Sequence, residues 1–334
     1  MQNVLIVNVN WLGDVIFSSP VFKAIKENHP KAHVACLAVP RVKEILESIA
    51  GIDEVIIYDE EGRHRSPWAK WGLIRTLRQK KFDAVFLLHG SFTRALLVFL
   101  AKIPQRVGYD TKSRGQFLTH RVLPPMGDFH RSDYYLNVIE SFVKVSDRSC
   151  ALEVSVQAGQ EVDQILKSHG VESGEPFVVA NLGGNWDLKR WSQQNFVQLI
   201  DRLCKEEKIK TIIPGSSEDH AWAQSVAGSN PQVVILAGKT NLKQLIALMK
   251  RAKLVVSADS GPLHIASAVG TPTIGLFGPT RPEVTGPRGK GKTTLLQKNV
   301  GCNRAPCYYL ECPDNVCMKA ITVDEVLATI KRIL

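Results

Sequence analysis

The sequence lacks a long apolar run, a signal segment and a high density of cysteine. Its longest apolar candidates, such as Ala95–Ala101, stop at a charged residue, well short of the roughly 18 residues that a membrane-spanning helix needs. The N-terminus has no basic segment ahead of an apolar one and no cleavage site, so no secretory signal is expected. Seven cysteines in 334 residues are too few for a secreted disulfide scaffold, and a reducing cytoplasm is expected.

Positive charge is what the chain has in excess. Hydrophobic residues make up 44% and charged residues 22%, which is the balance of a folded protein. Lys and Arg outnumber Asp and Glu by 42 to 32, and between Glu60 and Pro125 the counts are thirteen and four. This surplus favours an anionic partner such as nucleic acid, phosphorylated lipid or an acidic membrane surface. A solvated face without a partner is the alternative.

Strand-like and helix-like patterns alternate along both halves of the chain. Short β-branched runs predict strands at Asn3–Val9 and Phe177–Asn181, and each begins a series of alternating helices and strands. The length also suggests two domains. Together these features predict an α/β fold of two doubly wound, Rossmann-like domains facing a cleft. The domains are placed at residues 1–155 and 156–320, with a final helix at 321–334 that is expected to pack back on the first domain.

One stretch, Gly286–Thr293, matches the phosphate-loop pattern but lacks its context. That motif needs a buried strand directly before it and a helix directly after it. Here Pro279, Pro282 and Pro287 prevent an ordinary central strand, and the residues that follow are few and β-branched at the start. The stretch is therefore interpreted as an exposed basic loop, and a phosphate-loop kinase is the weaker alternative.

Four cysteines occur at regular intervals near the C-terminus. Cys302, Cys307, Cys312 and Cys317 are separated by four residues each. Structural zinc sites more often use two-residue spacings, and no other ligand pattern supports a metal. A bound metal and a reduced or disulfide-tied surface loop both stay open.

The loops that follow strands carry the candidate site, because open α/β sheets bind ligands beyond the carboxyl ends of their strands. After the first strand, Gly13 permits a tight turn and Asp14 stands just ahead of a helix. In the second domain, Gly183 and Gly184 permit close backbone approach, and Lys189 supplies a cation suited to phosphate. A loop cap and solvated basic side chains are the alternative interpretations.

Two further loops of the second domain fit a nucleotide. An acidic side chain at a strand end, Glu218 or Asp219, is placed to accept both hydroxyl protons of a ribose. In the next such loop, Pro262 fits the first turn of a helix, so the free amides and the helix dipole suit a diphosphate. His264 follows within that helix, where a structural histidine is the alternative.

Several of these stretches share one pattern along nearly the full chain. They are Leu12–Asp14 with Ser19 and Pro20, Lys189–Trp191, Gly215–His220, Asp259–His264 and Gly278–Thr280. In order and spacing they resemble the bacterial lipopolysaccharide heptosyltransferases of glycosyltransferase family 9, and within them the type II enzymes. The resemblance implies a GT-B fold, an ADP-L-glycero-D-manno-heptose donor on the second domain, and a lipid A–Kdo or heptosylated inner-core acceptor on the first.

The resemblance also implies roles for single residues. Asp14 matches the family's catalytic aspartate and is expected to act as the base. Donor binding is expected, by the resemblance, of Lys189, of Glu218 or Asp219, and of Asp259, Ser260, Gly261 and His264. From the glycine-rich loop itself it is also expected of Gly183, Gly184 and Asn185. The basic stretch of the first domain adds candidate acceptor-binding residues, which are Arg63, Arg65, Lys70 and Arg114.

The sequence holds no Asp-x-Asp triplet, so a metal-bridged diphosphate is not expected. Lys189 and the helix N-terminus would stabilise the leaving group instead, with no metal or other cofactor. One base and direct displacement imply inversion at the anomeric carbon. The enzyme is expected at the cytoplasmic face of the inner membrane, in peripheral contact with it and without a nucleic-acid partner. Another GT-B nucleotide-sugar transferase, an epimerase and a basic nucleic-acid-binding protein are the alternatives.

Overall fold

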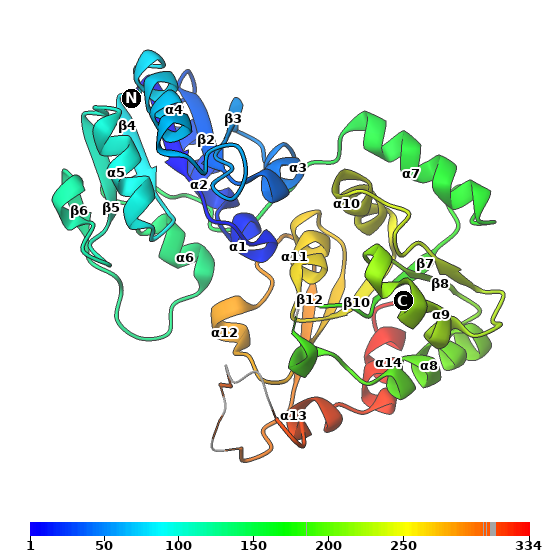
Figure 1. Cartoon of the computed structure of the whole chain (residues 1–334). Helices are drawn as coiled ribbons and strands as arrows, with labels where there is room; N and C mark the ends of the chain where they lie inside the picture. Colours follow the sequence, from blue (N-terminus) through cyan, green and yellow to red (C-terminus); the bar gives the residue numbers. More distant parts are fainter. Residues whose placement is uncertain (185, 303, 305, 308–311) are drawn as a thin grey trace. The chain divides into compact units, whose positions relative to one another are not determined.

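Each half of the chain folds around its own parallel six-stranded sheet (Figure 1). The computed structural model describes residues 1–184, 186–302, 304, 306–307 and 312–334. The chain divides into two compact units, Met1–Leu152 and Glu153–Leu334. This division lies close to the boundary expected after residue 155. The sheets are those of the doubly wound α/β class that the alternating pattern predicts.

The first unit has the strand order β3-β2-β1-β4-β5-β6. Its central strands are apolar and buried, as expected where helices cover both faces of a parallel sheet. The strands are β1 (Asn3–Val7), β2 (His33–Ala38), β3 (Glu54–Ile57), β4 (Ala84–Leu87), β5 (Gln105–Tyr109) and β6 (His120–Val122). The helices are α1 (Leu12–Phe17), α2 (Ser19–Asn28), α3 (Lys43–Leu46), α4 (Pro67–Gln79), α5 (Phe92–Leu100) and α6 (Arg131–Leu136), with short 3₁₀ turns at Pro40–Val42 and Gly115–Phe117.

The second unit has the strand order β12-β11-β10-β7-β8-β9. The strands are β7 (Phe177–Asn181), β8 (Lys210–Ile213), β9 (Val233–Ile235), β10 (Leu254–Ala258), β11 (Thr273–Phe277) and β12 (Thr293–Gln297). The longer helices are α7 (Val156–Ser168), α8 (Gln193–Arg202), α9 (His220–Ala227), α10 (Leu242–Arg251), α11 (Gly261–Ala268) and α14 (Val323–Lys331). The shorter ones are α12 (Pro282–Thr285), α13 (Val316–Lys319), 3₁₀ turns at Asp187–Lys189 and Ser217–Asp219, and a π turn at Leu203–Glu207.

The strand order reverses once in each sheet. In the first unit the reversal lies between β1 and β4, and in the second it lies between β7 and β10. Loops leaving the carboxyl ends of two such strands diverge to opposite faces of the sheet and leave a crevice. The loop after β1 leads into α1, whose first turn contains Asp14, so this residue lies inside a helix rather than just ahead of one as expected. The loops that carry Gly183 and Asp259 follow β7 and β10. The sequence-based placement of these loops at strand ends is therefore confirmed.

The C-terminal helix packs differently from the expectation. Val326, Leu327 and Ile330 of α14 belong to the hydrophobic core of the second unit, where the helix lies against α8 and β11. Just before it, the backbone oxygen of Ile321 accepts a hydrogen bond of 2.9 Å from the buried indole of Trp191. The helix thus belongs to the second unit rather than to the first, because its apolar stripe completes that core.

The phosphate-loop-like stretch Gly286–Thr293 leads into strand β12 and not into a helix. Its glycines are needed because other backbone segments pack directly against them. A Cβ at Gly289 would lie 2.0 Å from the backbone oxygen of Ser267, and one at Gly291 would lie 2.2 Å from that of Thr271. A phosphate loop needs a helix N-terminus after the glycines, so this stretch has the pattern without the structure.

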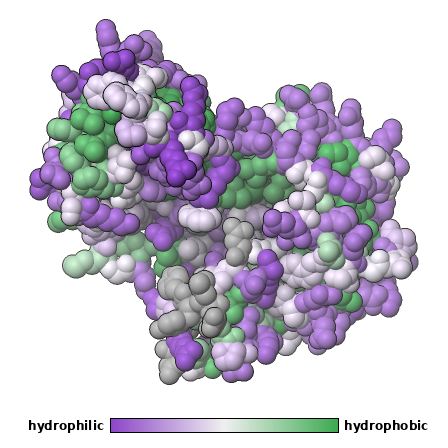
Figure 2. Space-filling view, in the orientation of Figure 1, coloured by the Kyte–Doolittle hydropathy of each residue, from purple (hydrophilic) through white to green (hydrophobic). Residues whose placement is uncertain are grey.

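The face of the molecule in Figure 2 is mostly hydrophilic, with apolar patches between the polar side chains. Within the part of the chain that the structure describes, no helix combines the length and the apolar character needed to cross a bilayer.

Candidate active site

Asp14 lies in the first turn of α1, directly after the loop that leaves β1. Its carboxylate oxygen Oδ1 accepts a hydrogen bond of 2.6 Å from the hydroxyl of Tyr135 on α6, and Nε of Arg131 lies 4.0 Å from the same oxygen. The Asp14 side chain is 27% exposed, whereas Tyr135 is buried. Burial and the charge of Asp14 raise the pKa of Tyr135 well above its ordinary value, so the hydroxyl stays a donor. The carboxylate is thus held through Oδ1 and stays partly exposed.

A buried arginine fixes the loop ahead of Asp14. Arg94 of α5 is 1% exposed and donates to the backbone oxygen of Asn8 at 3.0 Å and to Oδ1 of Asn10 at 2.9 Å. Its other terminal nitrogen donates to Glu60 at 3.0 Å. Such charge-assisted bonds from a fixed fork restrict loop geometry strongly. Sequence reasoning missed Arg94, although a single arginine within an otherwise apolar helix is a signal that could have found it.

The four basic residues expected to bind the acceptor are not brought together. Arg63 and Arg65 are exposed in the turn after β3, and Lys70 is half-buried on α4. Arg114 instead follows β5, four strands away in the sheet order, or about 19 Å at the usual strand spacing. Its guanidinium is fully buried and donates to the backbone oxygens of Tyr109 and His89. The expectation that Arg114 is an exposed acceptor ligand is therefore corrected, because its N–H groups donate to backbone oxygens inside the first unit.

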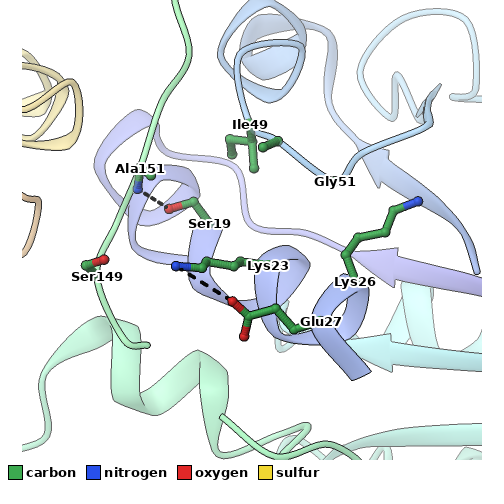
Figure 3. Close-up of a pocket in the computed structure, with 9 residues that line it drawn as sticks. Ser19, Lys23, Lys26, Glu27, Ile49, Gly51, Ser149 and Ala151 are labelled. Carbon is green, nitrogen blue, oxygen red and sulfur yellow. Dashed lines mark hydrogen bonds and ion pairs between the residues drawn. The ribbon is translucent and has the colours of Figure 1, made fainter. Parts of the chain in front are cut away.

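A separate cavity of about 290 Å³ opens beside α2 in the first unit (Figure 3). Lys23 and Lys26 line it, but both ammonium groups have carboxylate partners. Lys23 is 2.5 Å from Asp147, and Lys26 is 2.6 Å from Asp53. With its cations neutralised and its other walls largely apolar, this cavity is not a phosphate site.

In the second unit, Asp259 is the centre of a hydrogen-bonded cluster at the carboxyl end of β10. Its Oδ2 accepts bonds of 2.7 Å from Lys189 Nζ and 2.7 Å from the hydroxyl of Thr280, and a longer one of 3.3 Å from Thr285. His264 Nε2 lies 3.5 Å from Oδ1. Only 4% of the Asp259 side chain is exposed. Burial raises the pKa of this carboxyl, but the bond to His264 and the charges of His264 and Lys189 outweigh burial and hold it well below its usual range.

The cluster holds Lys189 in a defined place. Its side chain is 22% exposed, and its Nζ lies 5.5 Å from the centroid of the Trp186 ring in addition to the contact with Asp259. A lysine so anchored still presents N–H donors toward solvent, because an ammonium carries three. The geometry suits a cation that meets an anionic ligand without moving far.

The glycine loop after β7 is tied to the loop after β10. The side-chain amide of Asn181 donates to the backbone oxygen of Gly183 at 3.1 Å and to the hydroxyl of Ser260 at 3.1 Å. Ser260 precedes α11 as its N-cap residue, but its hydroxyl makes no capping bond to that helix. The first-turn amides of α11, beginning at Gly261, thus lack a side-chain cap, and such a helix N-terminus suits an anion. Asn181 is a further residue that sequence reasoning missed.

Asp219 lies against the same glycine loop. Its Oδ2 accepts bonds from the backbone nitrogen and the hydroxyl of Ser216, at 2.8 and 2.7 Å. The backbone bond is one half of a capping box, in which the Ser216 side chain accepts from the backbone nitrogen of Asp219. A Cβ at Gly183 would lie 3.2 Å from its Oδ1, so only glycine leaves that oxygen unobstructed there. Glu218 is exposed. Of the two acidic residues, Asp219 is therefore the one that lies against Gly183. Asn185, the next residue expected to bind the donor, lies outside the described residues.

The four C-terminal cysteines share one small cavity with Arg304 and Asn315. Each is a free thiol, with Cys302 exposed and the other three half-buried. Burial raises the pKa of Cys317. Within the described ranges, no group of three or more His, Cys, Asp or Glu side chains has the arrangement of a metal site.

Comparison with known proteins places the chain in a family. The family model described as glycosyltransferase family 9 (heptosyltransferase) matches residues 70–313. The chain belongs to glycosyltransferase family 9.

Relatives and solved structures agree along nearly the whole chain of this family 9 glycosyltransferase. Lipopolysaccharide heptosyltransferase 2 of Salmonella typhimurium is 26% identical over 311 residues, which cover 86% of this chain and 85% of the relative. A family 9 structure from Veillonella parvula is 24% identical and superposes with a TM-score of 0.87 over 99% of this chain and 97% of its own. The structure of ADP-heptose lps heptosyltransferase II from E. coli is 22% identical, with a TM-score of 0.81 over 100% and 98%. The resemblance inferred from the motifs and the GT-B class are thereby confirmed.

Proposed function

We propose that this glycosyltransferase moves heptose from ADP-L-glycero-D-manno-heptose to the inner core of lipopolysaccharide. The observation that carries the proposal is the Asp259–Lys189 cluster beside an uncapped helix N-terminus, at the point where the strand order of the second sheet reverses. That arrangement suits a nucleoside diphosphate. Its relatives include enzymes named as lipopolysaccharide heptosyltransferases, one of them with ADP-heptose in its name.

The donor is assigned to the second unit. Lys189 and the amides of Ser260 and Gly261 meet the diphosphate, where negative charge grows as the bond to the sugar breaks. Asp219 accepts hydrogen bonds from the ribose hydroxyls, with Glu218 as its exposed neighbour. The remaining donor-binding residues shape this site: the glycine loop by close approach of its backbone, and Asp259 with His264 by holding Lys189. They are Gly183, Gly184, Asp259 and His264; Asn185, which lies outside the described residues, is also proposed to bind the donor. Neither a metal nor another cofactor is required.

The acceptor is assigned to the first unit, with Asp14 as the base. The acceptor hydroxyl oxygen attacks the anomeric carbon of heptose as the carbon–oxygen bond to the diphosphate breaks. The hydroxyl proton passes to the Asp14 carboxylate, and ADP leaves with the electron pair. A single displacement of this kind inverts the configuration at that carbon. Tyr135 positions the carboxylate by its hydrogen bond and leaves the second oxygen to take the proton.

Exposed Arg63 and Arg65 and the half-buried Lys70 attract the anionic, Kdo-bearing acceptor. Such an acceptor is part of a lipid, so the enzyme works in peripheral contact with the cytoplasmic face of the inner membrane. Charge reversal at Arg63 and Arg65 is expected to raise the acceptor KM at low salt without changing donor affinity. Since exposed charges are screened within roughly 3 Å at 1 M salt, the same rise is expected for the unaltered enzyme in concentrated salt.

The deciding experiment uses the full chain with ADP-heptose and two purified acceptors, a Kdo-bearing lipid A and the same core carrying one heptose. Transfer to one of them, with release of ADP and inverted anomeric configuration, is expected. ADP-glucose and UDP-N-acetylglucosamine serve as control donors. Activity is expected to persist in EDTA. Faster transfer from a control donor would reject heptose, and activity lost to EDTA and restored by magnesium would reject the metal-free mechanism.

A further inference from the structure

Helix α4 (Pro67–Gln79) of the first unit carries two tryptophans on its outer face. Trp68 is 85% exposed and Trp71 is 40% exposed. The helix begins at a Ser66 cap, whose hydroxyl accepts from the backbone nitrogen of Ala69 at 3.2 Å. A tryptophan left in water forgoes the burial that its large apolar surface favours. Two of them one turn apart therefore indicate a surface that is covered in use.

The folded unit has no need of these two side chains for its own core. The opposite face of α4 supplies Leu73, Ile74 and Leu77 to the hydrophobic cluster of the first unit, and the helix lies beside α5. Positions 68, 71 and 75 are spaced i, i+3 and i+7, so they share one face of the helix. That face holds Trp68, Trp71 and Arg75, all exposed.

Four cations of α4 and of the turn before it have no ion-pair partner. Arg63, Arg65, Lys70 and Arg75 form no ion pair with any residue that the structure describes. Nearby groups of the same unit behave differently, since Lys80 is 2.7 Å from Glu54 and Arg94 is 3.0 Å from Glu60. The outer face of α4 therefore combines aromatic surface with the unpaired Arg75, and the turn before it adds Arg63 and Arg65 together with the exposed Glu61.

We propose that the outer face of α4, formed by Trp68, Trp71 and Arg75, docks on the anionic lipid surface of a membrane. Tryptophan rings settle at the level of lipid headgroups, where one edge is apolar and the other is wet. Unpaired arginines beside them add attraction to acidic headgroups. The choice of a bilayer over a protein rests on this charge complementarity and on the proposed function, in which the acceptor is itself a membrane lipid.

The test measures binding of the full chain to vesicles without donor or acceptor. Sedimentation with phosphatidylcholine vesicles is compared with sedimentation with vesicles that also contain phosphatidylglycerol. The unaltered protein is expected to bind the anionic vesicles more strongly. The double variant Trp68→Ala/Trp71→Ala is expected to lose roughly tenfold or more in partitioning, in line with the area of two aromatic rings. Arg75→Ala is expected to lose roughly fivefold, on anionic vesicles alone.

Two matched variants control for loss of any exposed charge or apolar group. Lys31→Ala removes an exposed, unpaired lysine of the same unit, and Val156→Ala truncates a valine that is 79% exposed in the second unit. Both are expected to bind vesicles as the unaltered protein does. Unchanged thermal unfolding of the tryptophan variant, and unchanged turnover on a deacylated, water-soluble acceptor, show that it is folded and active.

Equal vesicle binding by the tryptophan variant and the unaltered protein would overturn the proposal. So would absence of binding to anionic vesicles, or a change of sedimentation velocity in the variant that reveals a second copy of the chain on this face. None of these outcomes touches the transfer reaction. The proposed function fails on a different result, namely no transfer from ADP-heptose to the water-soluble acceptor.

Discussion

Each unit has one candidate aspartate in the segment that follows a central strand, but the surroundings of the two carboxylates differ. Asp259 is 4% exposed and accepts from a lysine and two threonines, with a histidine nearby. Asp14 is 27% exposed and accepts one short bond, from Tyr135. A carboxylate surrounded by donors serves to hold them in place. One with a single donor and an open side can exchange a proton with a ligand. The same residue type thus anchors a cluster in the second unit and is proposed to act as the base in the first.

The largest effect on this comparison is expected from a substitution at Asp14. The variant Asp14→Asn keeps the shape but cannot take a proton, so we expect turnover to fall by roughly 10²–10⁴. Binding of the ADP-sugar, measured by calorimetry, should change little because the donor is assigned to the other unit. Turnover close to that of the unaltered enzyme would remove Asp14 from the chemistry.

At Lys189 the next largest effect is expected. Lys189→Ala removes the cation proposed to meet the leaving diphosphate, and kcat/KM should fall by roughly 10²–10³, with both kcat and the donor KM affected. Asp259 keeps its threonine and histidine neighbours, so the variant should remain folded. Steady-state kinetics over donor concentration checks this, with Lys205→Ala, at an exposed lysine of the same unit, as the control. Unchanged kinetics would make Lys189 a structural partner of Asp259 only.

Tyr135→Phe tests whether positioning of Asp14 matters. The substitution removes one hydrogen bond to a charged group, which has a value of about 1.5–3 kcal/mol, and kcat should fall roughly tenfold or more. The donor KM should stay constant. Tyr134→Phe, at the neighbouring tyrosine of the same helix, is the matched control. Equal kcat for both variants would show that the bond to Asp14 has no part in turnover.

The last effect is on stability, away from the catalytic site, and concerns His89. Burial, together with the charges of Arg94, Arg114 and Lys112, lowers the pKa of His89 to about 4. Between that value and the ordinary value of about 6.5, the unfolded chain binds a proton that the folded chain does not. The free energy of unfolding should therefore fall as pH drops from about 6.5 to about 4, and this contribution should level off below.

His89→Asn is expected to flatten that part of the pH profile, measured by the urea midpoint of the full chain. The exposed His120→Asn variant is the control. A profile that keeps its slope in the His89 variant would assign the pH dependence to other groups.

Much of the fold followed from local sequence. The apolar β-branched runs that became β1 and β7 are hydrophobic enough to be buried on both faces. These signals lie within a few residues of each other and need no tertiary context. The sequence also predicted correctly that the phosphate-loop pattern does not form a phosphate loop, because the prolines that exclude a strand there lie close to the motif in sequence.

Other features of the structure could not be predicted from local sequence. Arg114 lies in a basic stretch of sequence and yet is fully buried, where the backbone carbonyls of Tyr109, at the end of β5, and of His89 accept its hydrogen bonds. Tyr135 meets Asp14 across 121 positions of sequence. The final helix packs in the core of the second unit, and not on the first, because its apolar side chains are buried there. Each of these depends on contacts between segments distant in the chain, which composition and spacing do not encode singly.

The sequence by itself determined the class of fold, the loops that carry Asp14, Lys189 and Asp259, and the family to which those motifs belong, because strand periodicity, helix caps and strand-end loops are local properties. Only the tertiary structure decided that the Asp259 carboxylate is buried while that of Asp14 is partly exposed, which cations are paired, and that Trp68 and Trp71 are exposed to water. Burial and ion pairing are properties of the packed chain, since they depend on which distant groups arrive at the same place.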